Sequence, residues 1–275
     1  MEALKIDLND YVHSGEGANG ESYFHKTDPG LMLKLYFAGA NIRNVVSEHE
    51  IAQKVYEAGI ATPRPGEFIT DGNGRYGIRF ERLADKVSFS RAVANEPDRV
   101  EELARRFARM SLELHSTKLD TTKFESMKER DLRDLHDSPF FTEDERRRTE
   151  KFLLEIPEID TALHGDLQYS NALITPKGDY FIDLGDFAYG HPYFDLGQVY
   201  LSCCFSPDEF IRETFHLEPA TAREFWRFFV MEYFGEDVSF KEVCETIRPY
   251  SGLMTLLIDR AMNTRMDIFH ALLPR

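Results

Sequence analysis

The feature that most constrains this chain is a change of pattern near residue 86. Before it, apolar and polar residues alternate in segments 4–12, 21–26 and 31–37, which is typical of half-buried β-strands. After it, apolar residues recur mostly at helical spacing. The pattern predicts two lobes, a small sheet-rich N-terminal lobe and a larger, mainly helical C-terminal lobe, in a chain of 275 residues.

Within the N-terminal part, residues 44–58 have helical periodicity, and Gly59 indicates where the helix ends. Segments 66–70 and 75–83 are separated by the turn sequence DGNG and predict a hairpin. Further on, a strand-rich island at 172–184 interrupts the helical pattern. Strands and helices are therefore segregated along the chain, and the class is α+β.

Composition excludes several classes of protein. The net charge is −15, and no basic run is interleaved with aromatic residues, so a nucleic-acid partner is not expected. No segment approaches the about 20 apolar residues that cross a membrane, and the N-terminus has no apolar signal sequence. We therefore expect no membrane partner and a cytoplasmic location. Acidic residues predominate in 206–245. A solvated face explains this best, although a pocket for a cationic ligand is the alternative.

The chain has three cysteines, Cys203, Cys204 and Cys244, and none lies in a CxxC motif. An odd number without paired spacing predicts neither a disulfide framework nor a zinc site. We expect them to act as small buried apolar residues.

A glycine-rich motif, Gly15-Glu-Gly17-Ala-Asn-Gly20, lies between two predicted strands. An ordinary turn explains such a motif, and a dinucleotide-binding fingerprint would lead from a strand into a helix. The strand-to-strand position favours a loop whose backbone N–H groups cover nucleotide phosphates. Lys34 lies inside the next strand, where it either faces solvent on an edge or binds phosphate, and its position after the glycine loop favours phosphate.

Glu48 is a candidate partner for Lys34. On the predicted helix 44–58 it follows Val45 by three residues and shares its apolar face. A carboxylate that points inward needs a cation, which Lys34 can supply. Glu50 is the competing candidate, but it lies on the polar side of the helix.

The segment HGDLQYSN places a carboxylate, Asp166, shortly before an amide, Asn171. Such a loop lets the aspartate accept a proton from a substrate hydroxyl while the asparagine turns back to a metal ion. An ordinary polar loop with Asn171 as a helix cap is an equally good explanation of this segment alone. The segment YFIDLGD adds Asp183 at the end of an apolar strand. A hairpin over 172–184 would bring Asp183 to Asn171, and together they predict a Mg²⁺ site.

Taken together, these segments resemble the protein-kinase-like superfamily, and most nearly its aminoglycoside phosphotransferase and choline kinase branch. HGDLQYSN is similar to the catalytic loop of that branch, and IDLGD to its metal-binding segment. GIATPRP and GHPYFDLG (190–197) resemble the stretches that follow the helix and the metal-binding segment. The resemblance extends over about residues 11–200 and implies a bilobal kinase-like fold, with a small antiparallel-sheet N-lobe containing one helix and a larger helical C-lobe.

The resemblance also implies an activity, the ATP- and Mg²⁺-dependent transfer of the γ-phosphate to a hydroxyl of a small molecule. Asp166 would orient or deprotonate that hydroxyl, and Asn171 and Asp183 would hold the Mg²⁺ ion. Asp195 would support the catalytic loop. The identity of the acceptor and the oligomeric state do not follow from the family.

For the nucleotide, the resemblance implies that Lys34, positioned by Glu48, binds the α- and β-phosphates beneath the glycine loop. The backbone of residues 80–83, with Glu81 and Leu83, would contact the adenine. Residues 1–82 would then form the nucleotide-binding lobe, and residues 83–275 the catalytic and substrate-binding lobe.

Two other functions remain as alternatives. A protein kinase needs an activation segment and a distal APE-like motif, whereas only residues 186–194 precede Asp195 here and no such motif follows. A catalytically silent nucleotide-binding module usually lacks the base, the metal ligand or the lysine. This chain has all three, in Asp166, Asp183 and Lys34.

Overall fold

The computed structural model describes residues 2–17 and 19–275. It divides into two compact units. The first comprises the chain up to Lys86 together with Leu173–Gly185, and the second comprises Val87–Ala172 and Asp186–Arg275. The α+β class predicted from the sequence is confirmed, with the main sheet in the first unit and most helices in the second. The lobe boundary at residue 82 stays a prediction.

The first unit is built on a six-stranded sheet with the order β1-β5-β6-β4-β3-β2. Every neighbouring pair is antiparallel except β1 and β5, which are parallel. The sheet is therefore mostly antiparallel, as predicted. Its strands are β1 (Leu4–Lys5), β2 (Tyr11–Glu16), β3 (Gly20–His25), β4 (Leu31–Tyr36), β5 (Pro65–Thr70) and β6 (Tyr76–Glu81).

The alternating segment 4–12 is not one strand, contrary to the prediction. A 3₁₀ turn over Leu8–Asp10 separates β1 from β2. The cause is local, because the Asp7 side chain accepts a hydrogen bond from the Asn9 backbone N–H at 2.9 Å. Such a side-chain-to-backbone bond competes with strand pairing. The turn lets β1 pair with β5 while β2 pairs with β3.

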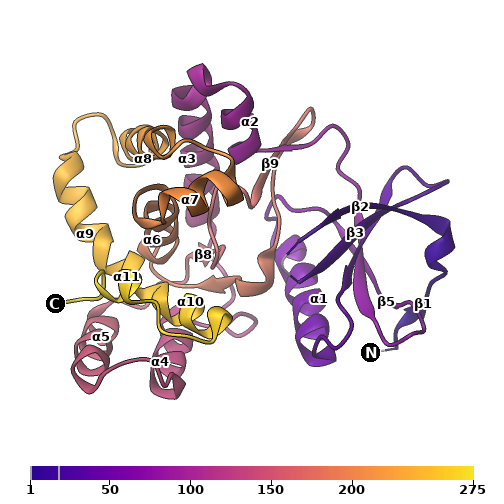
Figure 1. Cartoon of the computed structure of the whole chain (residues 1–275), viewed down its shortest axis with the longest axis horizontal. Helices are drawn as coiled ribbons and strands as arrows, with labels where there is room; N and C mark the ends of the chain where they lie inside the picture. The colour runs from indigo at the N-terminus through magenta and orange to yellow at the C-terminus, as the bar shows by residue number, and fades with distance from the viewer. Residues whose placement is uncertain (1, 18) are drawn as a thin grey trace. The chain divides into compact units, whose positions relative to one another are not determined.

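Helix α1 (Ile42–Glu57) is the helix predicted over 44–58. It begins where the Asn41 side chain accepts a hydrogen bond from the Arg43 backbone N–H. It ends before Gly59, whose φ of +83° favours glycine. Its buried side chains include Val45 and others spaced along one face. That face packs against β5 and β6, with α1 lying along the sheet in Figure 1.

A hairpin from much later in the chain completes the first unit. It consists of β9 (Ala172–Thr175) and β10 (Gly178–Phe181), in the strand-rich island predicted at 172–184. The backbone N–H of Phe181 donates to the carbonyl of Ala61 at 2.8 Å, which ties the hairpin to the segment after α1. Asp183 is thereby delivered to the same unit as β4 and α1.

The second unit is mainly helical, and its helices α3 and α8 pack side by side (Figure 1). Its aromatic core includes Phe107, Phe225 and Trp226, all fully buried. Core packing, rather than a stacking platform for a substrate, therefore explains Trp226. The elements are β7 (Val87–Ser88), α2 (Phe89–Asn95), α3 (Val100–Ser116), α4 (Met127–Asp137), α5 (Glu143–Glu155), β8 (Ala162–Leu163), β11 (Ala188–Tyr189), α6 (Tyr193–Tyr200), α7 (Asp208–Phe210), α8 (Pro219–Phe234), α9 (Phe240–Leu253), α10 (Thr255–Met262) and α11 (Asp267–His270), with π-helical turns at Leu201–Phe205 and Ile211–Phe215.

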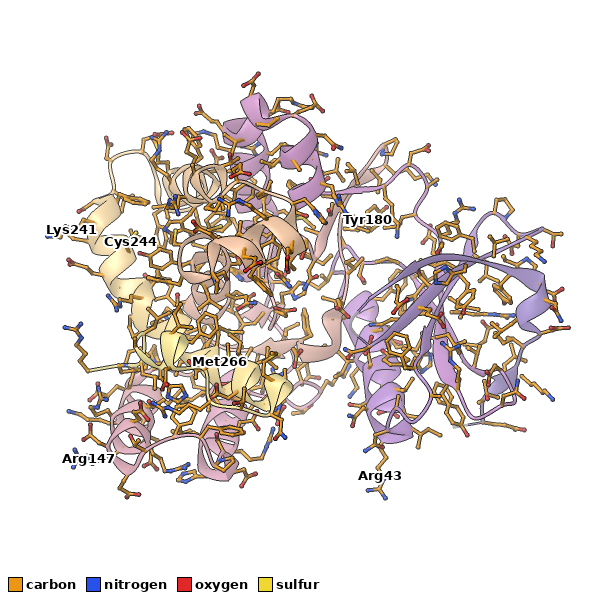
Figure 2. The ribbon with its side chains drawn as sticks, in the orientation of Figure 1. Arg43, Arg147, Tyr180, Lys241, Cys244 and Met266 are labelled. Atoms are coloured by element: carbon orange, nitrogen blue, oxygen red, sulfur yellow. The ribbon has the colours of Figure 1, made fainter. Side chains whose placement is uncertain are left out.

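In the described part of the chain, no helix has the length and apolar character needed to cross a membrane. The three cysteines are free thiols, and Cys203 is buried as expected, whereas Cys204 and Cys244 are half-buried. Charged side chains such as Lys241 on α9 and Arg147 on α5 extend outward from their helices (Figure 2).

Candidate active site

In the first unit, Lys34 on β4 contacts two carboxylates. Its Nζ donates to Glu48 Oε1 and to Asp183 Oδ1, each at 2.8 Å. Glu48 comes from α1, and Asp183 follows the β9–β10 hairpin. Glu50, the competing candidate for this partnership, is exposed. Three segments that are distant in sequence thus converge on one ammonium group.

The electrostatics of this cluster keep Lys34 charged. Burial alone lowers the pKa of Lys34, but the Asp183 and Glu48 carboxylates outweigh it and raise that pKa above its usual value. The Lys34 side chain is 24% exposed. It is therefore a permanent cation that a ligand can still reach.

The backbone at Asp183 is in an uncommon conformation. Its φ of +62° lies in the left-handed region, which non-glycine residues seldom adopt. Such a conformation is kept only where the surroundings over-determine it, and it is found disproportionately at functional sites. Here the contact with Lys34 holds the carboxylate of Asp183 in place.

A cavity of about 320 Å³ lies next to this cluster, within the first unit. One side is formed by the glycine-rich segment and the other by apolar residues such as Met32 and Phe80. The predicted nucleotide contacts that line it include Gly15, Gly17, Gly20, Lys34, Glu48 and Leu83, and the predicted metal ligand Asp183 lines it as well. Glu81 is exposed and does not line it, while its backbone N–H donates to the Arg64 carbonyl at 2.9 Å.

The glycine-rich segment connects β2 and β3, as predicted from its position between strands. Gly17 N–H donates to the Gly20 carbonyl at 2.8 Å, which closes the turn. A Cβ at Gly20 would overlap the Leu35 carbonyl of β4, so packing requires glycine there. Among the described residues, a Cβ at Gly17 would meet nothing closer than 3.9 Å, so its bare backbone leaves room there for a ligand. Ala18 of this motif lies outside the described residues.

In the second unit, the Asp166 carboxylate is held by side-chain amides. Asn171 Nδ2 donates to Asp166 Oδ2 at 2.9 Å and to the Asp166 carbonyl at 3.0 Å. Gln198 Nε2 donates to Asp166 Oδ1 at 2.7 Å. A weaker contact of 3.4 Å comes from Gln168 Nε2. The loop predicted from HGDLQYSN thus folds back on its own carboxylate and fixes its orientation.

Asp195, at the start of α6, supports this loop from beneath. Its carboxylate accepts from the backbone N–H groups of His164 at 2.7 Å and Gly165 at 2.9 Å. Asp195 is 1% exposed, and His115 Nε2 lies 3.0 Å from its Oδ2. Tyr233 OH in turn contacts His115 Nδ1 at 2.7 Å. The two buried residues Asp195 and His115 therefore anchor the loop to the helical core.

The family of the chain follows from its similarity to known proteins. A model of the phosphotransferase enzyme family matches residues 14–229. The chain belongs to this family. The resemblance inferred from its motifs is thereby confirmed. No curated protein sequence matches the chain significantly.

Solved structures share the fold of this phosphotransferase family member. Aminoglycoside phosphotransferase APH(4)-Ia has a TM-score of 0.67 at 12% identity, with 96% of this chain and 92% of that chain covered. Amicoumacin kinase hAmiN in complex with AMP-PNP, Ca²⁺ and Ami has a TM-score of 0.58 at 15% identity, covering 93% and 81%. A choline/ethanolamine kinase family protein from Mesorhizobium loti gives 0.55 at 14% identity, covering 95% and 83%.

Of the residues predicted for the site of this family member, Lys34, Glu48 and Asp183 meet in the first unit, and Asp166 meets Asn171 in the second. Two further residues of the site were not predicted from the sequence. Gln198 binds the Asp166 carboxylate directly, and Tyr233 extends the support of Asp195. A signal for Gln198 exists, because it follows Asp195 by three residues and so shares its helix face.

Asn171 has the polarity that a cation ligand needs. Its Nδ2 donates to Asp166, and its amide oxygen is an acceptor of the kind that suits a hard cation. The Asp183 carboxylate is a ligand of the same kind. Among the described residues, no group of three His, Cys, Asp or Glu side chains could hold a metal alone. Each of these oxygens, taken by itself, is a donor that suits an ion with further oxygen ligands from a nucleotide or water.

Proposed function

We propose that the chain is an ATP-dependent kinase that transfers the γ-phosphate of ATP to a hydroxyl of a small molecule. The observation that carries this proposal is Lys34, which binds Glu48 and Asp183 beside a cavity bordered by a glycine-rich loop. Such a lysine–glutamate pair with a metal-binding aspartate is the nucleotide-holding arrangement of kinases. The AMP-PNP bound to amicoumacin kinase hAmiN supports the choice of nucleotide.

The charge of the cavity favours a metal-bound nucleotide over a free one. Its lining includes Glu16, Glu21, Glu48 and Asp183, of which Glu21 pairs with Arg75, whereas its basic residues are Lys34 and Lys86. A bare triphosphate would meet a net negative surface. A divalent ion held by Asp183 and Asn171 would neutralise phosphate charge. The chain's own cation, Lys34, would hold the α- and β-phosphates.

Asp166 is proposed to act on the acceptor. Its carboxylate is kept in one orientation by Asn171 and Gln198, so it can accept the hydrogen bond of an incoming hydroxyl and direct the oxygen toward the γ-phosphate. Phosphoryl transfer depends mainly on positioning and charge neutralisation, so a strong base is not needed. The hydroxyl proton passes to Asp166 as the new oxygen–phosphorus bond forms and ADP leaves.

The acceptor is proposed to be cationic, on the basis of a small pocket within the second unit. Asp131, Asp134 and Asp186 line it, beside Gly165 of the catalytic loop. The acidic segment 206–245 lies outside this pocket, and its Glu232 and Glu236 pair with Arg105 and Arg109. Arg130 and Arg260 also line this pocket and pair with Asp186 and Asp134, so the pocket has one carboxylate more than it has cations, and this excess would attract an amino group of the acceptor.

The test is a screen of the purified protein against aminoglycosides, amino alcohols, amino sugars and their neutral analogues. ADP release is measured with ATP or GTP, with and without Mg²⁺, and the product is checked by ³¹P NMR. We expect acceptor-dependent ADP release that needs the metal ion and favours amines. Nucleotide binding without release for any acceptor would indicate the silent module instead. Failure to bind nucleotide would refute the proposal altogether.

A further inference from the structure

Gln198 on α6 contacts the Asp166 carboxylate at a shorter distance than Asn171 or Gln168 does. Its Nε2 donates to Oδ1 at 2.7 Å, while Asn171 and, more weakly, Gln168 donate to Oδ2. Each oxygen of the carboxylate thus has an amide donor. Asn171 and Gln168 belong to the same loop as Asp166, so Gln198 is the one of these three donors that comes from a separate element. It therefore fixes the carboxylate relative to the helical core.

The helix that carries Gln198 is rigidly seated. Ser251 Oγ on α9 donates to the Gly197 carbonyl at 2.8 Å. A Cβ at Gly197 would lie only 2.6 Å from the Tyr250 backbone carbon, so α6 and α9 approach at backbone distance. Asp195 on the same helix accepts from the backbone of the loop. Side chains on such an element are held more exactly than side chains on a loop.

Stability alone does not explain an amide at this position. Gln198 is 9% exposed, and among the described residues nothing donates to its buried Oε1. A buried carbonyl oxygen without a donor is unfavourable, so an apolar side chain of the same size would suit packing better. The only side-chain group that gains from the amide, within the described part, is Asp166.

We propose that Gln198 is a positioning residue that orients the Asp166 carboxylate toward the acceptor hydroxyl. The inference rests on the proposed function, because it concerns how Asp166 acts in phosphoryl transfer. It differs from a structural role in one measurable way. Removal of the amide should impair turnover while it leaves the stability of the fold unchanged or improves it.

The test compares wild type with Gln198→Met, which keeps the length and removes both polar atoms, and Gln198→Asn, which keeps an amide too short to reach. We expect both to lower kcat by about 10- to 100-fold, since small errors in orientation have effects of that size. The KM for ATP should stay within about twofold, because Gln198 does not line the nucleotide cavity. The melting temperature of Gln198→Met should equal or exceed that of wild type.

Gln53→Met is the matched control, because Gln53 is an exposed amide on α1 that contacts His49 and no catalytic group. It should leave kcat and KM unchanged. Crystal structures of wild type and Gln198→Met give a readout that needs no turnover, and we expect the Asp166 carboxylate to rotate in the variant. A wild-type protein without phosphoryl transfer would refute the proposed function while this comparison still tests Gln198. An unmoved carboxylate, an unchanged kcat, or a kcat that falls together with the melting temperature would overturn the positioning role.

Discussion

At the scale of single residues, one ammonium group organises the nucleotide side of the candidate site. Lys34 is held by carboxylates from a helix and from a hairpin, and both keep it protonated. A partly buried charge with two partners is costly to disturb, because removal of either leaves an imbalance. The arrangement therefore makes sharp predictions about Glu48 and its neighbour on the same helix, Glu50.

Glu48→Ala should weaken the use of ATP, because Lys34 would then lose one of its two carboxylate partners and shift from its proposed phosphate-binding position. We expect kcat/KM for ATP to fall by roughly 10- to 100-fold. Glu50→Ala removes a glutamate from the exposed face of the same helix, two residues away, and should have no measurable effect. Steady-state kinetics of both variants measure this difference. Equal losses of kcat/KM for ATP would contradict the role of the Lys34–Glu48 pair.

Asp166→Asn should remove the proposed acceptor contact without disturbing the fold, since an amide of the same shape replaces the carboxylate. We expect kcat to fall by roughly 100-fold or more, while nucleotide affinity measured by calorimetry stays near that of wild type. Asp183→Asn should instead abolish the effect of Mg²⁺ on nucleotide affinity. A fully active Asp166→Asn protein would exclude Asp166 from the chemistry.

How far these residues were predictable depends on the kind of information involved. Lys34, Glu48, Asp166, Asn171 and Asp183 carry chemistry in recognisable local patterns, so their segments could be identified from the sequence. The side-chain contacts of Gln198 and Tyr233 could not, because they depend on how separate helices pack. Spacing along a helix shows only that two side chains share a face.

At the scale of elements, the loop that carries Asp166 is constrained by one backbone position. Gly165 has a φ of +84°, and a Cβ there would overlap the carbonyl of Asp186. Both the dihedral angle and the space therefore require glycine. This explains physically why the loop has glycine before its aspartate.

Gly165→Ala should distort the loop that presents Asp166. We expect a large loss of kcat together with a lower melting temperature. Gly178→Ala is the matched control, because Gly178 also has a positive φ, of +137°, but has open space around it. That variant should show only the backbone strain, about 1–3 kcal/mol, with normal kinetics. Similar kinetics for both variants would contradict the steric argument.

Element prediction from sequence succeeded where periodicity dominates and failed where a local side chain competes with it. The helix predicted over 44–58 appears as α1, because its apolar stripe and its end signal agree. The strand predicted over 4–12 is interrupted, because the Asp7 side chain accepts a hydrogen bond from the Asn9 backbone N–H. Alternation of apolar residues carries no information about such a bond.

At the scale of the whole molecule, buried charge makes stability depend on pH. Burial raises the pKa of Asp131 on α4 to about 7, against the opposing effect of Arg130. An unfolded aspartate titrates near pKa ~3.9. Between these values the folded state binds the extra proton, so this group contributes stability at low pH that is lost as the pH rises from about 4 to 7.

Asp131→Asn should therefore stabilise the protein above pH 7 and have little effect near pH 4. We expect a gain on the order of 1 kcal/mol, which raises the melting temperature by about 2–4 °C. Asp134→Asn is the contrast, because Asp134 Oδ2 accepts from Arg260 at 2.7 Å and its loss should destabilise. Thermal melting of the three proteins across this pH range measures both effects. A pH-independent gain for Asp131→Asn would contradict the titration.

The first unit consists of two separate stretches of the chain, and this affects how it folds during synthesis. Residues up to Lys86 do not complete it, because Leu173–Gly185 contributes β10, Asp183 and the bond from Phe181 to Ala61. A ribosome delivers these parts in order, at about 5–20 residues per second. The nascent sheet must therefore wait several seconds or more, until the hairpin emerges from the exit tunnel, before Lys34 meets its second carboxylate. A message truncated shortly before codon 173 would yield a polypeptide that never acquires this pairing.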